Sequence, residues 1–83
     1  MEGWLKCSVE RGMFSDEVAV TYPAEGPALT SVFVPSVNVR GTPGGPGLVR
    51  VRVARSANAI LAILPTSYQD SVPVSEADLS ETP

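Results

Sequence analysis

The sequence predicts a small all-β domain. Apolar residues recur in short, often alternating runs, and eight prolines and seven glycines interrupt those runs within 83 residues. This punctuation excludes a bundle of long helices, and 43% hydrophobic residues is too many for a disordered chain. We therefore expect five or six short antiparallel strands in one SH3-like barrel. An OB-like barrel or a small β-sandwich is the alternative.

The strongest structural signal is the stretch 48–64, which we interpret as a β-hairpin. Valines alternate with Arg50 and Arg52 in its first half, so one face of that strand is dry and the other is wet. Residues 59–64 are apolar without alternation, which predicts a second strand covered on both faces.

The loop of this hairpin fixes its register. A three-residue loop over 56–58 sets Val53 opposite Leu61 and Val51 opposite Ile63. A two-residue loop would instead shift every pair by one, because side chains alternate along a strand. We expect the three-residue loop.

The remaining strands are expected where alternation or β-branched residues are bounded by turn residues, at 4–11, 17–22, 29–34 and 71–75. The first of these places Cys7 on a buried face. The last contains Pro73, which restricts it to a sheet edge because proline has no N–H to donate.

The segments between these strands are expected to be turns and loops. Residues 12–16 form a turn, 23–27 an exposed connection and 66–71 a polar loop. Residues 37–39 resume the third strand past Pro35, and 40–47 form a mobile loop rich in glycine and proline.

The C-terminal region predicts one short helical turn over 75–79, with Ser75 and Asp78 as its capping residues. Residues 80–83 are expected to be a disordered tail, so that 1–79 form a single domain. No internal repeat is evident in the sequence.

Charge and cysteine content limit the classes of partner and location. The net charge of −3 argues against general affinity for nucleic acid or anionic membranes. One cysteine cannot form an internal disulfide, and no apolar run approaches the roughly 18 residues of a membrane helix. We expect a cytoplasmic protein, and the five-to-one excess of arginine over lysine is consistent with a bacterial origin.

No motif predicts catalysis or a bound metal or cofactor. The chain has no histidine, the usual general base and nitrogen ligand. Apolar neighbours predict a buried, unreactive Cys7. The acidic pairs at 16–17 and 76–78 lack the spacing of a calcium loop, and the glycine-rich stretch 41–47 lacks the lysine of a phosphate-binding loop.

Arginines supply the candidate contact residues for a partner or for nucleic acid, namely Arg40, Arg50, Arg52 and Arg55. Small barrels that bind single-stranded nucleic acid combine such cations with exposed aromatic rings on the same face. The alternative is that the arginines pair with carboxylates such as Glu10 or Glu17 and cover apolar surface with their stems.

Three functional hypotheses follow. The first is a non-catalytic interaction module that associates with itself, because the chain is small, apolar and without a catalytic constellation. The alternative is a barrel that binds nucleic acid through Arg50 and Arg52. The third is a small enzyme or cofactor-binding protein built on carboxylates and serines.

Overall fold

The structure is a computed structural model that describes residues 1–23, 29–66 and 70–82. Its elements are eight strands and two 3₁₀ turns, in the order β1 (Glu2–Arg11), β2 (Glu17–Pro23), β3 (Leu29–Pro35), η1 (Ser36–Asn38), β4 (Val39–Gly41), β5 (Gly45–Arg55), β6 (Ile60–Ile63), β7 (Ser71–Val74), η2 (Glu76–Asp78) and β8 (Leu79–Ser80). No helix in these ranges is long and apolar enough to cross a membrane.

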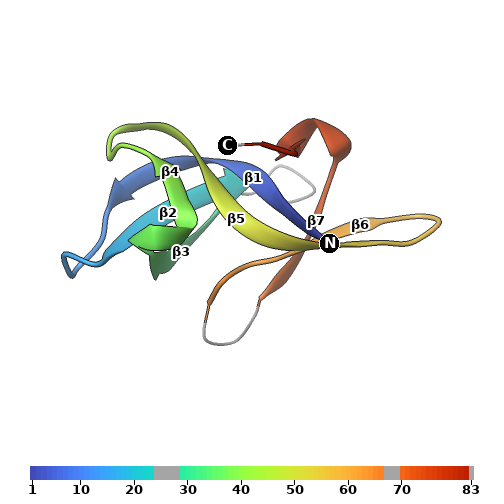
Figure 1. Ribbon diagram of the computed structural model, residues 1–83, viewed down its shortest axis with the longest axis horizontal. Coiled ribbons are helices and arrows are strands. Elements are labelled where there is room, and N and C mark those ends of the chain that lie inside the picture. The colour runs from blue at the N-terminus through green and yellow to red at the C-terminus, as the bar shows by residue number, and fades with distance from the viewer. Residues whose placement is uncertain (24–28, 67–69, 83) are drawn as a thin grey trace.

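All the strands join one antiparallel sheet that curls into a half-barrel (Figure 1). The order along the sheet is β3-β2-β1-β5-β6-β7, with β4 paired to β5 and β8 paired to β1. This arrangement confirms the predicted all-β class and the small antiparallel barrel-like architecture.

The long strands β1 and β5 form the centre of the sheet and pair with each other from Glu2↔Arg52 to Val9↔Gly45. On its other edge, β1 pairs with β8 near its start and with β2 near its end. In the same way, β5 pairs with β4 near its start and with β6 near its end. Each central strand therefore leaves a gap between its two outer neighbours.

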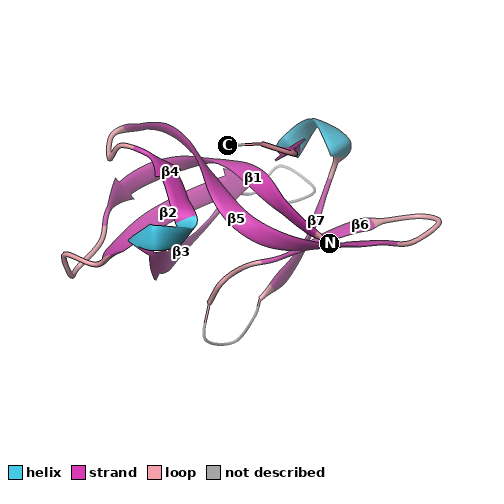
Figure 2. Ribbon diagram, viewed as in Figure 1, coloured by secondary structure: helices cyan, strands magenta, loops and turns pink. Residues whose placement is uncertain are grey.

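The ladders relate the two halves of the chain by a pseudo-two-fold axis between β1 and β5. The succession β1-β2-β3-η1-β4 repeats as β5-β6-β7-η2-β8, and each half places its last strand against the central strand of the other half. Leu5 pairs with Leu79 as Val49 pairs with Val39, so the two crossings have the same register. Figure 2 shows the two 3₁₀ turns near opposite ends of the molecule.

This register also defines equivalent residues, several of which are identical: Gly3 and Gly47, Val9 and Val53, Arg11 and Arg55, Pro23 and Pro65, Ser31 and Ser71, Val32 and Val72, Val34 and Val74. The expectation that the chain has no internal repeat is therefore wrong. Loops of different length shift the spacing from one pair of strands to the next, which hides the repeat in the linear sequence.

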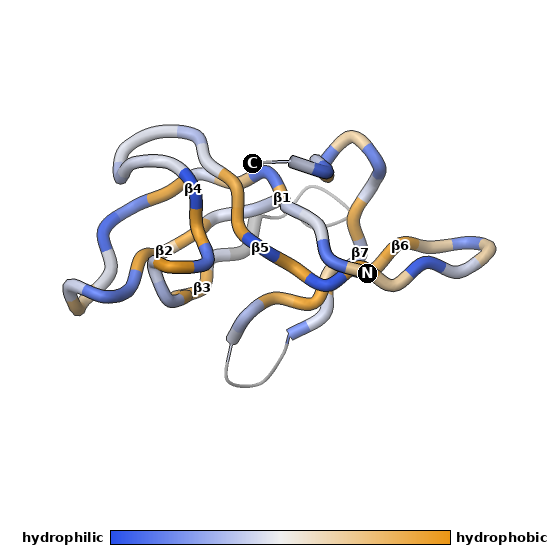
Figure 3. The backbone as a smooth tube through the Cα atoms, viewed as in Figure 1, coloured by the Kyte–Doolittle hydropathy of each residue, from blue (hydrophilic) through white to orange (hydrophobic). Residues whose placement is uncertain are grey.

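The core lies inside the curled sheet and draws on both halves. Its fully buried members include Leu5, Val9, Val20, Val49 and Leu64. On β5 the valines face inward and the arginines outward, as predicted, and Figure 3 shows the resulting alternation of apolar and polar residues along this strand. Such alternation is expected when one face of a sheet is covered and the other is open.

The predicted register of the β5–β6 hairpin is wrong by one residue. Val53 lies opposite Ala62, and four residues, Ser56 to Ala59, form the loop. The Ser56 N–H donates to the Ala59 carbonyl at 2.9 Å. This register places Ala62 and Leu64 in the core with the β5 valines, because residues paired across a ladder have their side chains on the same face of the sheet.

The second strand of that hairpin is also covered less than predicted. Ala62 is fully buried, but the Leu61 side chain is 38% exposed on the outer face of β6. Only one face of the strand therefore packs into the core. The long apolar run 59–64 is not evidence of cover on both faces here.

Most of the glycine-rich stretch 40–47 belongs to the sheet, in β4 and β5, so the prediction of a mobile loop there is wrong. Residues 39–41 form β4 and pair with β5, rather than resuming β3, and the two strands are joined by a tight turn. Gly41 and Gly44 have φ angles of 129° and 91°, which favour glycine. A Cβ on Gly47 would lie 2.5 Å from the Arg40 carbonyl oxygen.

Most other local predictions agree with the structure, but Ser80, expected in a disordered tail, lies in β8 and pairs with Trp4. The first three predicted strands and the edge strand with Pro73 correspond to β1, β2, β3 and β7. The Asp78 carboxylate accepts from the N–H and Oγ of Ser75, so this capped turn forms as expected. The predicted connection at 23–27 and polar loop at 66–71 lie partly outside the described residues.

Candidate functional site

Trp4 brings two of the four candidate arginines together on the outer face of the sheet. Arg50 lies directly opposite Trp4 in the β1–β5 ladder, and Arg40 comes from the neighbouring strand β4. The guanidinium carbons lie 5.2 Å (Arg40) and 5.3 Å (Arg50) from the centre of the indole ring. Both distances are typical of cation–π contacts.

The indole ring in this cluster is nearly covered. Trp4 is 8% exposed, although it lies outside the buried core cluster. Cross-strand neighbours and arginine stems therefore cover it from the outer face. An open stacking surface for nucleic-acid bases needs a free ring, and the Trp4 ring does not provide one.

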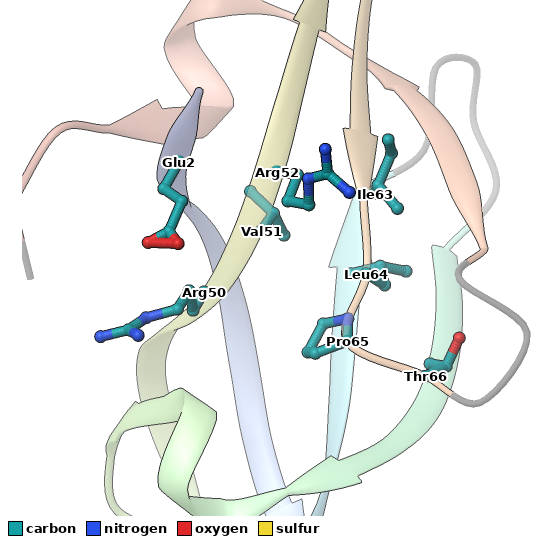
Figure 4. Close-up of a pocket in the computed structure, with 8 residues that line it drawn as sticks. All are labelled: Glu2, Arg50, Val51, Arg52, Ile63, Leu64, Pro65 and Thr66. Atoms are coloured by element: carbon teal, nitrogen blue, oxygen red, sulfur yellow. The ribbon is translucent and has the colours of Figure 1, made fainter.

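Arg52 lies one step further along the same face, between Glu2 on β1 and Ile63 on β6. A cavity of about 340 Å³ lies beside Arg52. Residues of β1, β5, β6 and the segment after β6 line it, namely Glu2, Arg50, Val51, Arg52, Ile63, Leu64, Pro65 and Thr66. Figure 4 shows the Arg52 side chain directed toward Ile63 and the Arg50 side chain directed away from Leu64 and Pro65.

Arg55 lies apart from this cavity and is neutralised. Its guanidinium forms an ion pair with Glu76 in η2, the one such pair within the described ranges. The prediction that arginines pair with carboxylates is thus confirmed for Arg55, although the partner is Glu76 rather than Glu10 or Glu17. Because Arg55 and Glu76 are well exposed, the pair adds little to stability.

The buried titratable groups show no sign of activation. Cys7 is buried as predicted, and loss of solvation raises the pKa of its thiol to about 11. Burial, with a smaller contribution from Asp70, also raises the pKa of Tyr22. Within the described ranges, no three side chains of the metal-binding types gather at one place.

A second surface was not identified from the sequence. Four exposed apolar side chains lie near the β1–β2 turn, which we call the apolar end: Met13, Phe14, Phe33 and Val37. They are 77%, 67%, 51% and 75% exposed, respectively. The Ser36 N–H donates to the Asp16 carbonyl at 2.9 Å and so holds η1 against this turn. A turn that contains Met and Phe was the available signal.

The equivalent positions in the second half are small or polar. Phe33 corresponds to Pro73 and Val37 to Ala77, and the β5–β6 loop has the sequence Ser-Ala-Asn-Ala. The same architecture therefore forms without large apolar side chains at these places. The fold alone does not require the apolar end.

Comparison of the chain with protein-family models, with curated proteins and with solved structures found no match.

Proposed function

We propose that the protein is a non-catalytic interaction module that associates with a second copy of itself through β3 and the apolar end. The observation that supports this most is the difference between the two halves. One end exposes Met13, Phe14, Phe33 and Val37, whereas the equivalent positions of the other half are small or polar. Exposed apolar groups of this kind mark interaction surfaces.

The backbone of β3 fits the same proposal. In an antiparallel ladder, successive residues direct their N–H and C=O groups to alternate edges of the strand. The Val53 N–H donates to the Met1 carbonyl, and this bond fixes the alternation in the β5–β1, β1–β2 and β2–β3 ladders in turn. On β3, the N–H and C=O of Ser31 and Phe33 therefore point away from β2. Among the described strands, β3 pairs with β2 alone. Its outer edge therefore offers hydrogen-bonding groups to another strand.

The equivalent edge strand β7 is protected from such pairing. Pro73 occupies the position of Phe33 and has no N–H to offer, which is a common way to block edge pairing. A second copy related by a two-fold axis through Val32 would pair Ser31 with the partner's Phe33. Because β3 contains no charged residue, two copies of it can pair in this antiparallel way without repulsion between like charges.

Analytical ultracentrifugation of the whole chain tests this proposal. Phe33→Pro copies the protected edge of β7 and removes an N–H that β2 does not use, so the fold should persist while the dimer dissociates. Leu61→Ser is the matched control, because Leu61 is exposed on β6 outside the apolar end. A monomer at every accessible concentration, or a dimer unaffected by Phe33→Pro, would contradict the proposal.

Nucleic-acid binding through Arg50 and Arg52 is the second candidate. In its favour, an aromatic ring lies on the same face as Arg40 and Arg50. The net charge and the near-complete burial of Trp4 weigh against it. It requires affinity that falls steeply with salt and is lost on combined replacement of Arg50 and Arg52 by Ala. Absence of binding to single- and double-stranded probes at low salt would end it.

A cytoplasmic location fits both proposals. The single cysteine is free and buried, as expected where thiols stay reduced. Fractionation of the natural host cell tests this location, and recovery of the protein outside the cytoplasm would contradict it.

A further inference from the structure

We propose that the cavity at the β5 gap binds the free C-terminal carboxylate of a partner peptide whose last residue is apolar. The first support is the backbone of Arg50. Neither β4, whose ladder stops at Val49, nor β6, whose ladder starts at Arg52, pairs with this residue. The Val53 N–H donates to the Met1 carbonyl, so the backbone groups of Val53, Val51 and Val49 face β1. Successive residues of a strand alternate between its two edges, and the N–H and C=O of Arg50 therefore point away from β1, into the gap.

Pro65 keeps this gap open. If the β5–β6 ladder continued past Ile63, Pro65 would lie opposite Arg50, and proline cannot donate the next ladder hydrogen bond. Pairing with β5 instead stops at Ile63, while the Leu64 N–H still donates to the Asp70 carbonyl at 2.8 Å, in register with the β6–β7 ladder. One residue of β5 is left with a donor and an acceptor facing a cavity.

The equivalent gap on β1 differs from the β5 gap in the position of its cation. Lys6 is equivalent to Arg50, and its ammonium group donates to the Ala77 carbonyl of η2 at 2.9 Å. The Arg50 guanidinium instead lies over Trp4. The cation at the β5 gap is therefore held away from η1, the turn equivalent to η2.

The side chains around the gap define the ligand chemistry. Arg52 is exposed and forms no ion pair with the described carboxylates, so it can bind an anion. Ile63 and Pro65 line the same cavity on the side of β6, and Val51 and Leu64 complete its apolar wall. A carboxylate with an apolar group beside it complements both features.

A chain terminus fits better than a continuous strand because the gap spans so few residues. The last residue of a peptide would donate its N–H to the Arg50 carbonyl, and its carboxylate would accept from the Arg50 N–H and the Arg52 guanidinium. Its side chain would lie on the outer face against Ile63 and Pro65. Glu2, opposite Arg52, would weaken binding by repulsion.

Amide chemical shifts of the ¹⁵N-labelled full chain, titrated with acetyl-Ser-Thr-Val, test the inference. The matched probe is the same peptide with a C-terminal amide. We expect the acid to bind about tenfold more tightly than the amide, which corresponds to about 1.4 kcal/mol. The amide shifts should occur at Arg50, Ile63, Leu64 and Thr66. Equal affinity, no shift at millimolar acid, or shifts only at the apolar end would overturn the proposal.

Two variants sharpen this test. Arg52→Gln should weaken binding of the acid about tenfold and leave binding of the amide unchanged, whereas Glu2→Gln should strengthen binding of the acid several-fold. A misfolded variant could not produce this gain. Arg55→Gln is the control, because Arg55 pairs with Glu76 away from the cavity. These outcomes are independent of dimerisation, which Phe33→Pro tests separately.

Discussion

Arg50 lies directly opposite Trp4 on the neighbouring central strand, with its guanidinium carbon 5.3 Å from the centre of the indole ring. Trp4 is the only tryptophan in the chain, so tryptophan fluorescence reports on the surroundings of this one ring. We expect Arg50→Ala to shift the emission to longer wavelength, to increase quenching by acrylamide and to cost about 0.5–1 kcal/mol of stability. Arg52→Ala, the control, should leave the emission unchanged; an equal shift would place the indole elsewhere.

The two faces of β5 predict opposite tolerance to substitution. Val51 is 2% exposed, so Val51→Asp places a charge in the core and should cost about 3 kcal/mol or more. Arg52→Thr changes an exposed position and should cost less than about 0.5 kcal/mol. Denaturant unfolding measures both, and similar midpoints for the two variants would refute the assigned faces.

Glycines at equivalent positions differ in the space around them. An added Cβ would meet the Arg40 carbonyl oxygen and the Val9 side chain at 2.5 Å at Gly47, but at Gly3 it would meet one Val53 methyl group at 3.2 Å. Gly47→Ala should therefore cost about 2 kcal/mol or more, and Gly3→Ala clearly less. Thermal unfolding of the two variants compares these costs. Equal losses would mean that β4 does not approach β5 so closely.

Alkaline pH should destabilise the fold through Cys7. Burial raises the pKa of its thiol from 9.0 to about 11, so the folded state binds this proton more tightly than the unfolded state. The stability from the protonated thiol is complete below pH 9 and is lost as pH rises through 11.

Cys7→Val isolates that effect, because valine already stands at the equivalent position, Val51. The free energies of unfolding of the variant and the natural chain should differ by a constant below pH 9 and diverge between pH 9 and 11. Tyr22, whose pKa is also raised, is common to both proteins. Parallel curves over that range would refute the role of Cys7.

The all-β class and most of the strands were predictable because they depend on local alternation. The valine face of β5, the buried Cys7 and the edge position of Pro73 all follow from which residues can face a core or lack an N–H. The capped turn at Ser75 is equally local.

Features that depend on distant pairing were not predictable in this way. The β5–β6 register depends on which face of β6 enters the core. That face carries Ala62, whose small side chain predicts burial less strongly than Leu61 or Ile63 on the other face. The stretch 40–47 was expected to be a loop because glycine and proline favour turns. Here Gly47 is needed for close approach of β4 to β5.

The candidate sites divide in the same way. Exposure of Arg50 and Arg52 follows from alternation along the strand. The contact of Arg40 and Arg50 with Trp4, the Arg55–Glu76 pair and the β5 gap all join residues far apart in the sequence. The apolar end likewise joins the β1–β2 turn to β3 and η1, and only Met13 and Phe14 in the turn gave a local signal.

The exchange of last strands between the halves also constrains how the molecule folds. Neither half can form all its strand pairs alone, because β4 of the first half pairs with β5 of the second, and β8 of the second half pairs with β1 of the first. Pairing β1 with β8 also requires contacts across nearly the whole chain, which slows folding. Thermal denaturation should therefore be a single cooperative transition, with no populated intermediate in which one half is formed and the other is not.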